Sequence, residues 1–225
     1  MILSKKFPLK KSAVKEFHGL ILEWGSKNTI DYPWRRERTP YRVLISEILL
    51  TRTKAAQVEP VYLKFMEKYP TVEKFLKMEV KTVKVLIQSL GLLFRADTLK
   101  TISKQLREDY DSKIPSDLKD LKALKGIGNY GANAILCFGY GKKRPILDSN
   151  FIRIYERLFE VKSISKTAKT DKFLWNFSEK ILPEEDYVLY NYSLLDLGGS
   201  ICLPRKPDCQ KCHLQSICSY YNYYC

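Results

Sequence analysis

The stretch at residues 120–150 constrains the fold of this chain more than any other part of the sequence. A leucine-bearing segment that ends at Lys125 predicts one helix, and a segment rich in Ala, Ile and Leu that begins at Tyr130 predicts another. Gly126 and Gly128 lie between them, and glycine can adopt positive φ and lets another molecule approach the backbone closely. The sequence therefore predicts two helices joined by a very tight hairpin.

This hairpin is suited to bind an anion. The second helix points its N–H groups into the turn, where the helix dipole favours a negative charge such as a phosphate. A plain pair of antiparallel helices would share the pattern, so the two glycines alone leave both interpretations open. The basic run at 142–144, followed closely by Asp148, favours the phosphate-binding interpretation.

Positive charge is spread along the whole chain. Lysine and arginine number 39 against 25 acidic residues, which gives a formal net charge of +14. Such a charge suits a polyanion, most commonly nucleic acid, although a lysine-rich solvated surface would give the same count. No apolar run approaches the roughly 20 residues of a membrane span, and the N-terminus lacks the apolar core of a signal peptide. We expect an intracellular protein that binds no membrane and acts as a monomer.

The sequence predicts an all-α fold, because no alternating strand pattern of any length occurs. The Thr-Pro pair at 39–40 predicts the cap and first turn of a helix that runs to about Thr53. Mostly apolar side chains flank Glu47 in this helix, which predicts a desolvated carboxylate with a raised pKa, as a proton donor requires. A helix-capping role or a pairing with an arginine is the alternative for Glu47. Thr51 and Arg52 lie one turn further, within reach of a ligand.

Asp148 directly precedes a strongly amphipathic segment at 149–159. Asp148 or Ser149 would cap that helix, and capping alone would explain an acid at this position without any chemistry. The two roles are compatible. A carboxylate held by backbone donors at a helix start is predicted to have a lowered pKa and to stay ionised, which suits the stabilisation of positive charge.

Four of the six cysteines have the most specific spacing in the chain: Cys202-x6-Cys209-x2-Cys212-x5-Cys218. Disulfides are not expected inside a cell, and four closely spaced thiols with basic residues between them predict a metal centre. The spacing alone leaves zinc and an iron–sulfur cluster open, with zinc the more common structural metal. Cys137 lies in an apolar helical segment and is predicted to be part of the core.

The hairpin LKGIGNYGANAIL, the aspartate of PILD and the four-cysteine loop together resemble the endonuclease III superfamily of helix-hairpin-helix DNA glycosylases. The resemblance implies a two-lobed all-α fold with a DNA-binding cleft. It places a six-helix lobe with the hairpin at 33–141. The other lobe combines 1–32 with 142–225 and carries a [4Fe-4S] cluster on the cysteine loop at 202–218.

The resemblance also assigns roles in base excision repair of double-stranded DNA with a mismatched or damaged base. Asp148 matches the catalytic aspartate and would stabilise positive charge on the sugar, while Glu47 and Tyr130 would contact the extruded base. Arg52 would fill the gap that the extruded base leaves in the duplex, or it would read the guanine that has lost its partner. The resemblance places the phosphate-binding hairpin at Gly126, Ile127 and Gly128. The other DNA-binding residues expected from their charge and position are Thr51, Arg52, Arg205, Lys206 and Lys211.

The residue after GIGN distinguishes branches of this superfamily. Members that also cut the DNA strand carry a nucleophilic lysine there, whereas this chain has Tyr130, and a phenol cannot form a Schiff base with the sugar. A monofunctional glycosylase without strong lyase activity is therefore expected. Tyr130, together with Arg52 after LISEILL, resembles the T·G mismatch thymine glycosylases, which also accept uracil.

Two other functions compete with this one. The first is an adenine glycosylase for A·G or A·8-oxoguanine pairs, but that branch typically has serine in place of Tyr130 and glutamines in place of Thr51 and Arg52. The second is a non-catalytic protein that binds damaged DNA, against which Asp148 and Glu47 argue.

Overall fold

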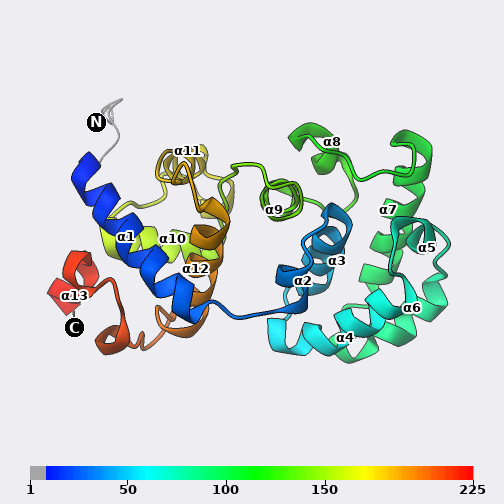
Figure 1. Cartoon of the computed structure of the whole chain (residues 1–225), viewed down its shortest axis with the longest axis horizontal. Helices are drawn as coiled ribbons and strands as arrows, with labels where there is room; N and C mark the ends of the chain where they lie inside the picture. Colours follow the sequence, from blue (N-terminus) through cyan, green and yellow to red (C-terminus); the bar gives the residue numbers. More distant parts are fainter. Residues whose placement is uncertain (1–8, 225) are drawn as a thin grey trace. The chain divides into compact units, whose positions relative to one another are not determined.

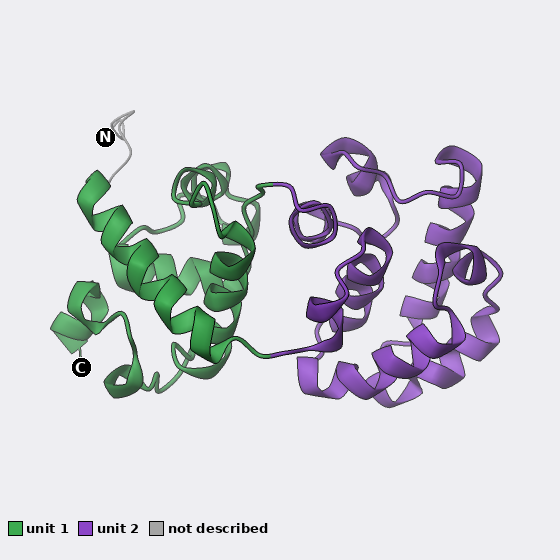
Figure 2. Ribbon diagram, in the orientation of Figure 1, with its two compact units in different colours: residues 1–30, 143–225 green, residues 31–142 purple. Residues whose placement is uncertain are grey.

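The computed structural model describes residues 9–224, and every regular element in that range is a helix (Figure 1). The predicted all-α class is confirmed. The chain divides into two compact units, which Figure 2 shows in different colours. Unit 1 consists of residues 1–30 and 143–225, and unit 2 consists of residues 31–142.

Unit 2 is a continuous run of short helices. In chain order they are α2 (Pro33–Arg36), α3 (Pro40–Leu50), α4 (Ala55–Lys68), α5 (Val72–Leu76), α6 (Val80–Ile87), the 3-10 turn η1 (Gln88–Leu90), α7 (Phe94–Asp109), α8 (Leu118–Ala123), α9 (Asn129–Ala134) and the π-helical turn η2 (Ile135–Gly139).

Helix α3 is the centre of unit 2. It begins as predicted, because the Thr39 hydroxyl accepts a hydrogen bond from Arg42 N at 3.3 Å and Pro40 occupies the first turn. Most of its side chains are buried against α4, α9 and η2. A Cβ at Gly139 would lie 2.7 Å from the Pro40 Cα, so η2 approaches the start of α3 at backbone distance.

Unit 1 joins the two ends of the sequence. Its elements are α1 (Lys11–Asn28), α10 (Ser149–Phe159), η3 (Ala168–Thr170), α11 (Lys172–Lys180), α12 (Tyr187–Ser200), η4 (Cys209–Lys211), η5 (Gln215–Ile217) and α13 (Ser219–Tyr224).

Helices α1 and α12 lie side by side in unit 1 although they are far apart in the sequence (Figure 1). A side chain at Gly25 would collide with Ser193, so the two backbones approach closely there. The buried residues Phe17, Ile21 and Trp24 form the inner face of α1, and the Phe17 ring packs edge-on against Tyr190 of α12. Burial of these apolar faces is the main source of stability for such helices.

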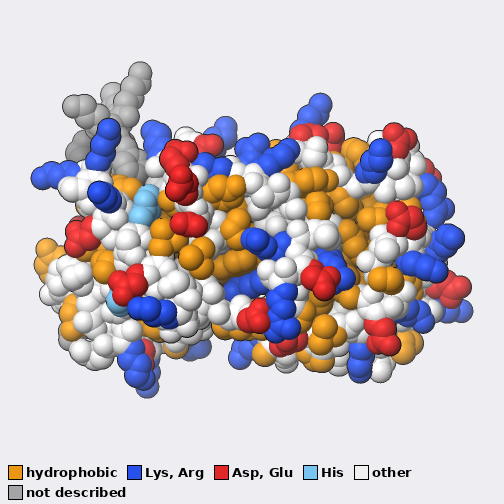
Figure 3. Space-filling view, in the orientation of Figure 1, with side chains coloured by type: hydrophobic (Ala, Val, Ile, Leu, Met, Phe, Trp, Pro, Cys, Tyr) orange, Lys and Arg blue, Asp and Glu red, His pale blue; other side chains and the backbone are white. Residues whose placement is uncertain are grey.

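Lysine and arginine side chains are distributed over the visible face of each unit, with acidic side chains among them (Figure 3). Across residues 9–224, no helix combines the length and the apolar character that crossing a membrane requires.

Candidate functional site

The predicted hairpin links α8 to α9 in unit 2. Helix α8 is capped by Asp117, whose carboxylate accepts from Lys119 N and Asp120 N. The turn closes through Ile127 N, which donates to the Leu124 carbonyl at 3.1 Å, and α9 starts directly afterwards at Asn129.

The two hairpin glycines differ in conformation. Gly126 has φ +78°, in the left-handed region that favours glycine, whereas Gly128 has φ −88° and caps α9. Of the two hairpin glycines, only Gly126 therefore adopts the positive φ that the sequence predicts for the turn. Both glycines are exposed, while the Ile127 side chain between them is buried and anchors the turn.

The hairpin rests on two other helices of unit 2. A Cβ at Gly126 would lie 3.0 Å from Thr98 Cγ2 on α7 and 3.9 Å from Ile48 Cδ1 on α3. The glycine backbone is thus in close contact with the side chains of both helices, which fixes where the hairpin can lie.

Glu47 and Tyr130 lie on helices of unit 2 that pack against each other, α3 and α9 respectively. Both side chains are partly buried. The Thr51 hydroxyl donates to the Glu47 carbonyl at 3.1 Å, so the end of α3 is closed by a local contact.

Helix α3 ends at Leu50, three residues earlier than the sequence predicts. The chain then turns through Arg52, which has φ +56° and is exposed. Left-handed backbone at a residue other than glycine is uncommon and costs free energy, so other contacts must stabilise it.

Arg95 at the start of α7 supplies such contacts. Its Nη2 donates to the Thr51 carbonyl and, at 2.5 Å, to Thr53 Oγ1. Arg95 was not among the residues predicted from the sequence. A signal was available, since Arg95 shares the helical spacing of the buried residues Leu99, Ile102 and Leu106 of α7.

Asp148 lies in unit 1 and caps α10, as predicted. Its Oδ1 accepts from Asn150 N at 2.8 Å and from Phe151 N at 3.0 Å, and its Oδ2 accepts from Asn150 Nδ2 at 3.0 Å. The carboxylate thus has three donors on two neighbouring residues.

The expected lowering of the Asp148 pKa is wrong. Burial raises the pKa of Asp148 above its ordinary value. The two backbone donors and the charges of Lys169 and Arg153 act in the opposite direction but do not offset burial. Desolvation disfavours the charged form of the carboxyl. Burial in unit 1 therefore raises the pKa of Asp148 by more than the helix cap lowers it.

A chain of hydrogen bonds connects Asp148 with the cysteine loop. Asn150, which donates to Asp148, accepts at its Oδ1 from Arg153 Nη2 at 2.8 Å. Arg153 Nε in turn donates to the Cys202 carbonyl at 2.7 Å, and its Nη2 also donates to the Gly198 carbonyl at 2.7 Å. Asn150 and Arg153 were not predicted from the sequence.

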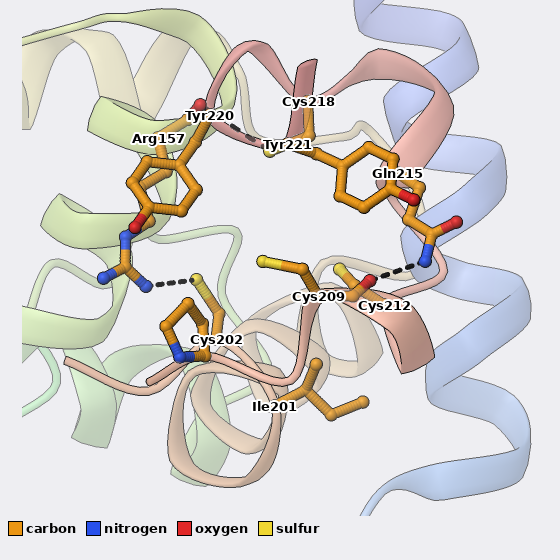
Figure 4. A pocket seen from close by; sticks show the side chains of 10 residues that line it. Arg157, Ile201, Cys202, Cys209, Cys212, Gln215, Cys218, Tyr220 and Tyr221 are labelled. Atoms are coloured by element: carbon orange, nitrogen blue, oxygen red, sulfur yellow. Dashed lines mark hydrogen bonds between the residues drawn. The ribbon is translucent and has the colours of Figure 1, made fainter. Parts of the chain in front are cut away.

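The four spaced cysteines line one cavity in unit 1, and Figure 4 shows their side chains around a shared space. Arg157 Nη1 lies 3.4 Å from the Cys202 Sγ and donates to the Leu203 carbonyl at 2.7 Å. Within the described residues, no group of three or more His, Cys, Asp or Glu side chains is arranged to hold a metal ion. As a donor set, four thiols suit either a zinc ion or an iron–sulfur cluster.

The predicted phosphate-binding residues of this loop differ in their surroundings. Arg205 and Lys206 are exposed. Lys211 is also exposed, and its Nζ pairs with Asp208 at 2.8 Å, which raises the pKa of the lysine. Exposed pairs of this kind contribute little to stability.

Comparison with known proteins places the chain among DNA repair proteins. Residues 45–180 match the family described as HhH-GPD superfamily base excision DNA repair protein. A thymine/uracil-DNA glycosylase of Methanothermobacter thermautotrophicus is 37% identical over 208 residues, which cover 92% of this chain and 94% of that protein.

Solved structures agree with this placement. A thermostable thymine-DNA glycosylase matches with a TM-score of 0.87 at 36% identity, over 94% of this chain and 97% of the other. Endonuclease III in a trapped covalent complex with DNA matches with a TM-score of 0.81 at 21% identity, over 95% and 98% of the two chains. The second match shows the fold alone, and it confirms the predicted endonuclease III fold.

Proposed function

We propose that this chain, which belongs to the HhH-GPD superfamily of base excision DNA repair proteins, removes thymine or uracil mispaired with guanine by hydrolysing the N-glycosidic bond. The observation that carries the proposal is the 37% identity to a thymine/uracil-DNA glycosylase along nearly the whole of both chains. The partner is double-stranded DNA inside the cell, and the protein acts as a monomer.

The reaction requires extrusion of the target nucleotide, because stacking in the duplex hides the glycosidic bond. A mismatched base costs less to extrude than a paired one, so mispairing contributes to selectivity. The hairpin at Gly126, Ile127 and Gly128 binds the phosphate backbone. Its exposed glycines allow close approach and its buried isoleucine holds the turn in place.

Asp148 is the catalytic carboxylate. As the bond breaks, the sugar gains positive charge, which ionised Asp148 stabilises while it orients or deprotonates the attacking water. Asn150 Nδ2 holds the Oδ2 atom, and the helix N–H groups hold Oδ1, so the carboxylate is fixed before substrate binds. Preorganised charge of this kind is worth about 10²- to 10³-fold in rate.

Glu47 and Tyr130 contact the extruded base, Glu47 by proton donation or hydrogen bonding and Tyr130 by stacking. Their location on the packed helices α3 and α9 of one unit supports a shared role. Because Tyr130 carries no amine, the enzyme is monofunctional and leaves the strand intact.

Thr51 and Arg52 form the turn that faces the opposite strand, where Arg52 reads the orphaned guanine. Guanine presents two acceptors that an arginine fork matches. The exposure of Arg52 supports this assignment.

Cys202, Cys209, Cys212 and Cys218 would hold a [4Fe-4S] cluster. When bound, such a group supplies thiolate–iron bonds that fix the fold of the loop. The loop residues Arg205, Lys206 and Lys211 then face DNA phosphates. Arg157 Nη1 donates toward the Cys202 sulfur at 3.4 Å, so a guanidinium already lies beside one of the four thiols.

One experiment tests this function. Labelled duplexes that contain T·G, U·G, A·G or A·8-oxoguanine pairs are incubated with the protein and analysed with and without alkali. We expect cleavage of T·G and U·G duplexes, and only after alkali. Activity confined to adenine would contradict the substrate, cleavage without alkali would contradict monofunctionality, and binding without any base release would indicate a non-catalytic protein.

A further inference from the structure

Arg95 is the largest fully buried side chain of the described chain, with 1% of its surface exposed. Its Nη2 donates to two acceptors, the Thr51 carbonyl and Thr53 Oγ1. Its Nε and Nη1 are buried and have no hydrogen-bond partner. A buried guanidinium usually has a carboxylate beside it, but here both acceptors are uncharged atoms of one turn.

Both acceptors flank Arg52. A single side chain therefore holds the turn from either side of the residue that has the left-handed φ of +56°. A hydrogen bond from an arginine to a free carbonyl at the end of a helix is a common contact, and the bond to the Thr51 carbonyl is of this kind. The second contact, with a side chain beyond Arg52, goes further, since it restrains the backbone of Arg52 itself.

The same turn of α7 also contacts the hairpin. Thr98 follows Arg95 by three residues, so the two side chains lie on neighbouring positions of one helix face. Thr98 Cγ2 would lie 3.0 Å from a Cβ at Gly126. The first turn of α7 thus contacts the phosphate-binding hairpin through Thr98 and the Arg52 turn through Arg95.

We propose that Arg95 is a positioning residue that holds Arg52 at a fixed distance from the hairpin, so that Arg52 meets the base opposite the extruded one. The inference rests on the proposed function, in which Arg52 reads guanine and the hairpin binds phosphate. Arg95 itself touches no DNA. It acts through the backbone of residues 51–53, and its loss leaves Arg52 present but misplaced.

The test compares single-turnover rates on U·G and U·A duplexes for wild type, Arg52→Ala, Arg95→Met and the double variant. Arg95→Met keeps the volume of the side chain and removes a buried charge, so the fold is expected to survive. We expect it to lower the U·G rate by about 10²-fold, as misplacement of a group near the reaction does. The preference for U·G over U·A should fall by about 10- to 100-fold, and equally in Arg52→Ala. The double variant should show no further loss of preference.

Three further variants separate positioning from stability. Arg95→Lys keeps a donor for the Thr51 carbonyl and should recover part of the preference. Thr53→Val removes one acceptor with little change of shape and should lose part of it. Arg107→Met is the matched control, because Arg107 lies on the same helix and donates to the Leu76 carbonyl at 2.6 Å. It should leave both rates unchanged.

Other results would contradict the role of Arg95, the role of Arg52 or the proposed function, and these cases can be told apart. If Arg95→Met lowers both rates equally together with the melting temperature, Arg95 is only structural and the inference is wrong. If Arg52→Ala loses the preference and Arg95→Met keeps it, the inference alone is wrong. If Arg52→Ala keeps the preference, the guanine-reading role of Arg52 and the inference are both wrong. If wild type releases no uracil, the proposed function is wrong.

Discussion

The side-chain amide of Asn150 donates a hydrogen bond to Asp148 Oδ2 at 3.0 Å, while the backbone N–H of the same residue donates to Asp148 Oδ1 at 2.8 Å. One residue therefore contacts both carboxylate oxygens. Its amide oxygen is held in turn by Arg153, so the amide cannot rotate to present its oxygen to Asp148.

Asn150→Ala should raise the pKa of Asp148 further, because the ionised carboxylate loses one donor. A hydrogen bond to an ionised carboxylate favours the charged form, so its loss shifts the pKa upward. The acidic limb of the rate profile should therefore move to higher pH than in the wild type. Asn28→Ala is the control, because it removes a hydrogen bond from a side-chain amide to the Trp24 carbonyl in α1. For this variant an unchanged profile is expected. An unchanged profile for Asn150→Ala would contradict the role of the amide.

The wild-type rate should show its acidic limb above the ordinary aspartate pKa of 3.8. Burial raises the pKa of Asp148, and only the ionised form stabilises the positive sugar. The rate is therefore expected to be present above the raised pKa and to fall as the pH drops through it. Single-turnover rates across the acidic range measure this limb, and a limb below pH 3.8 would contradict the assignment.

Asp148→Asn should lose at least about 10²- to 10³-fold in rate while it still binds DNA. The difference in stability between this variant and the wild type should also depend on pH. Because folding raises the pKa of Asp148, the wild type loses stability as the pH rises through that pKa. The asparagine is never charged, so the melting temperature of the variant relative to wild type should increase from about pH 4 to pH 7. Full activity in this variant would leave Asp148 with its capping role only.

Tyr130→Lys should cut the strand without alkali, because an amine at this position can form a Schiff base with the sugar. Borohydride should then trap a covalent complex between protein and DNA. Tyr130→Phe removes only the hydroxyl and should give no trapped complex. Failure of the lysine variant to be trapped would mean that the residue 130 side chain does not reach the sugar.

The purified protein should be brown and contain iron and sulfide in equal amounts. Cys212→Ser should lose visible absorption and iron. Cys137→Ser is the matched control, since Cys137 is buried in η2 of the other unit, and it should keep both. Colourless wild-type protein with stoichiometric zinc would contradict the cluster.

Features that depend on neighbouring residues could be predicted from the sequence. Thr39 and Pro40 marked the start of α3, and Asp148 marked the start of α10, because capping involves atoms two or three residues apart. The resemblance carried by the hairpin and the cysteine spacing led to the correct fold.

Features that depend on distant residues could not be predicted. Helix α3 ends early at Leu50, where Arg95, more than forty residues away in the sequence, holds the turn. The pKa of Asp148 was mispredicted because burial is a property of the packed unit, whereas the cap is local. The link from Asn150 through Arg153 to Cys202 likewise joins residues that the sequence keeps far apart.

The pairing of α1 with α12 sets the order in which the two units are completed during synthesis. Unit 2 is one continuous segment and is complete once residue 142 has left the ribosome. Helix α1 ends at Asn28 but packs on a helix that begins at Tyr187, so at about 5–20 residues per second it waits about 8–30 s for its partner. Throughout that interval Phe17, Ile21 and Trp24 have no apolar surface of α12 to cover them, so the apolar face of α1 is buried only late in synthesis.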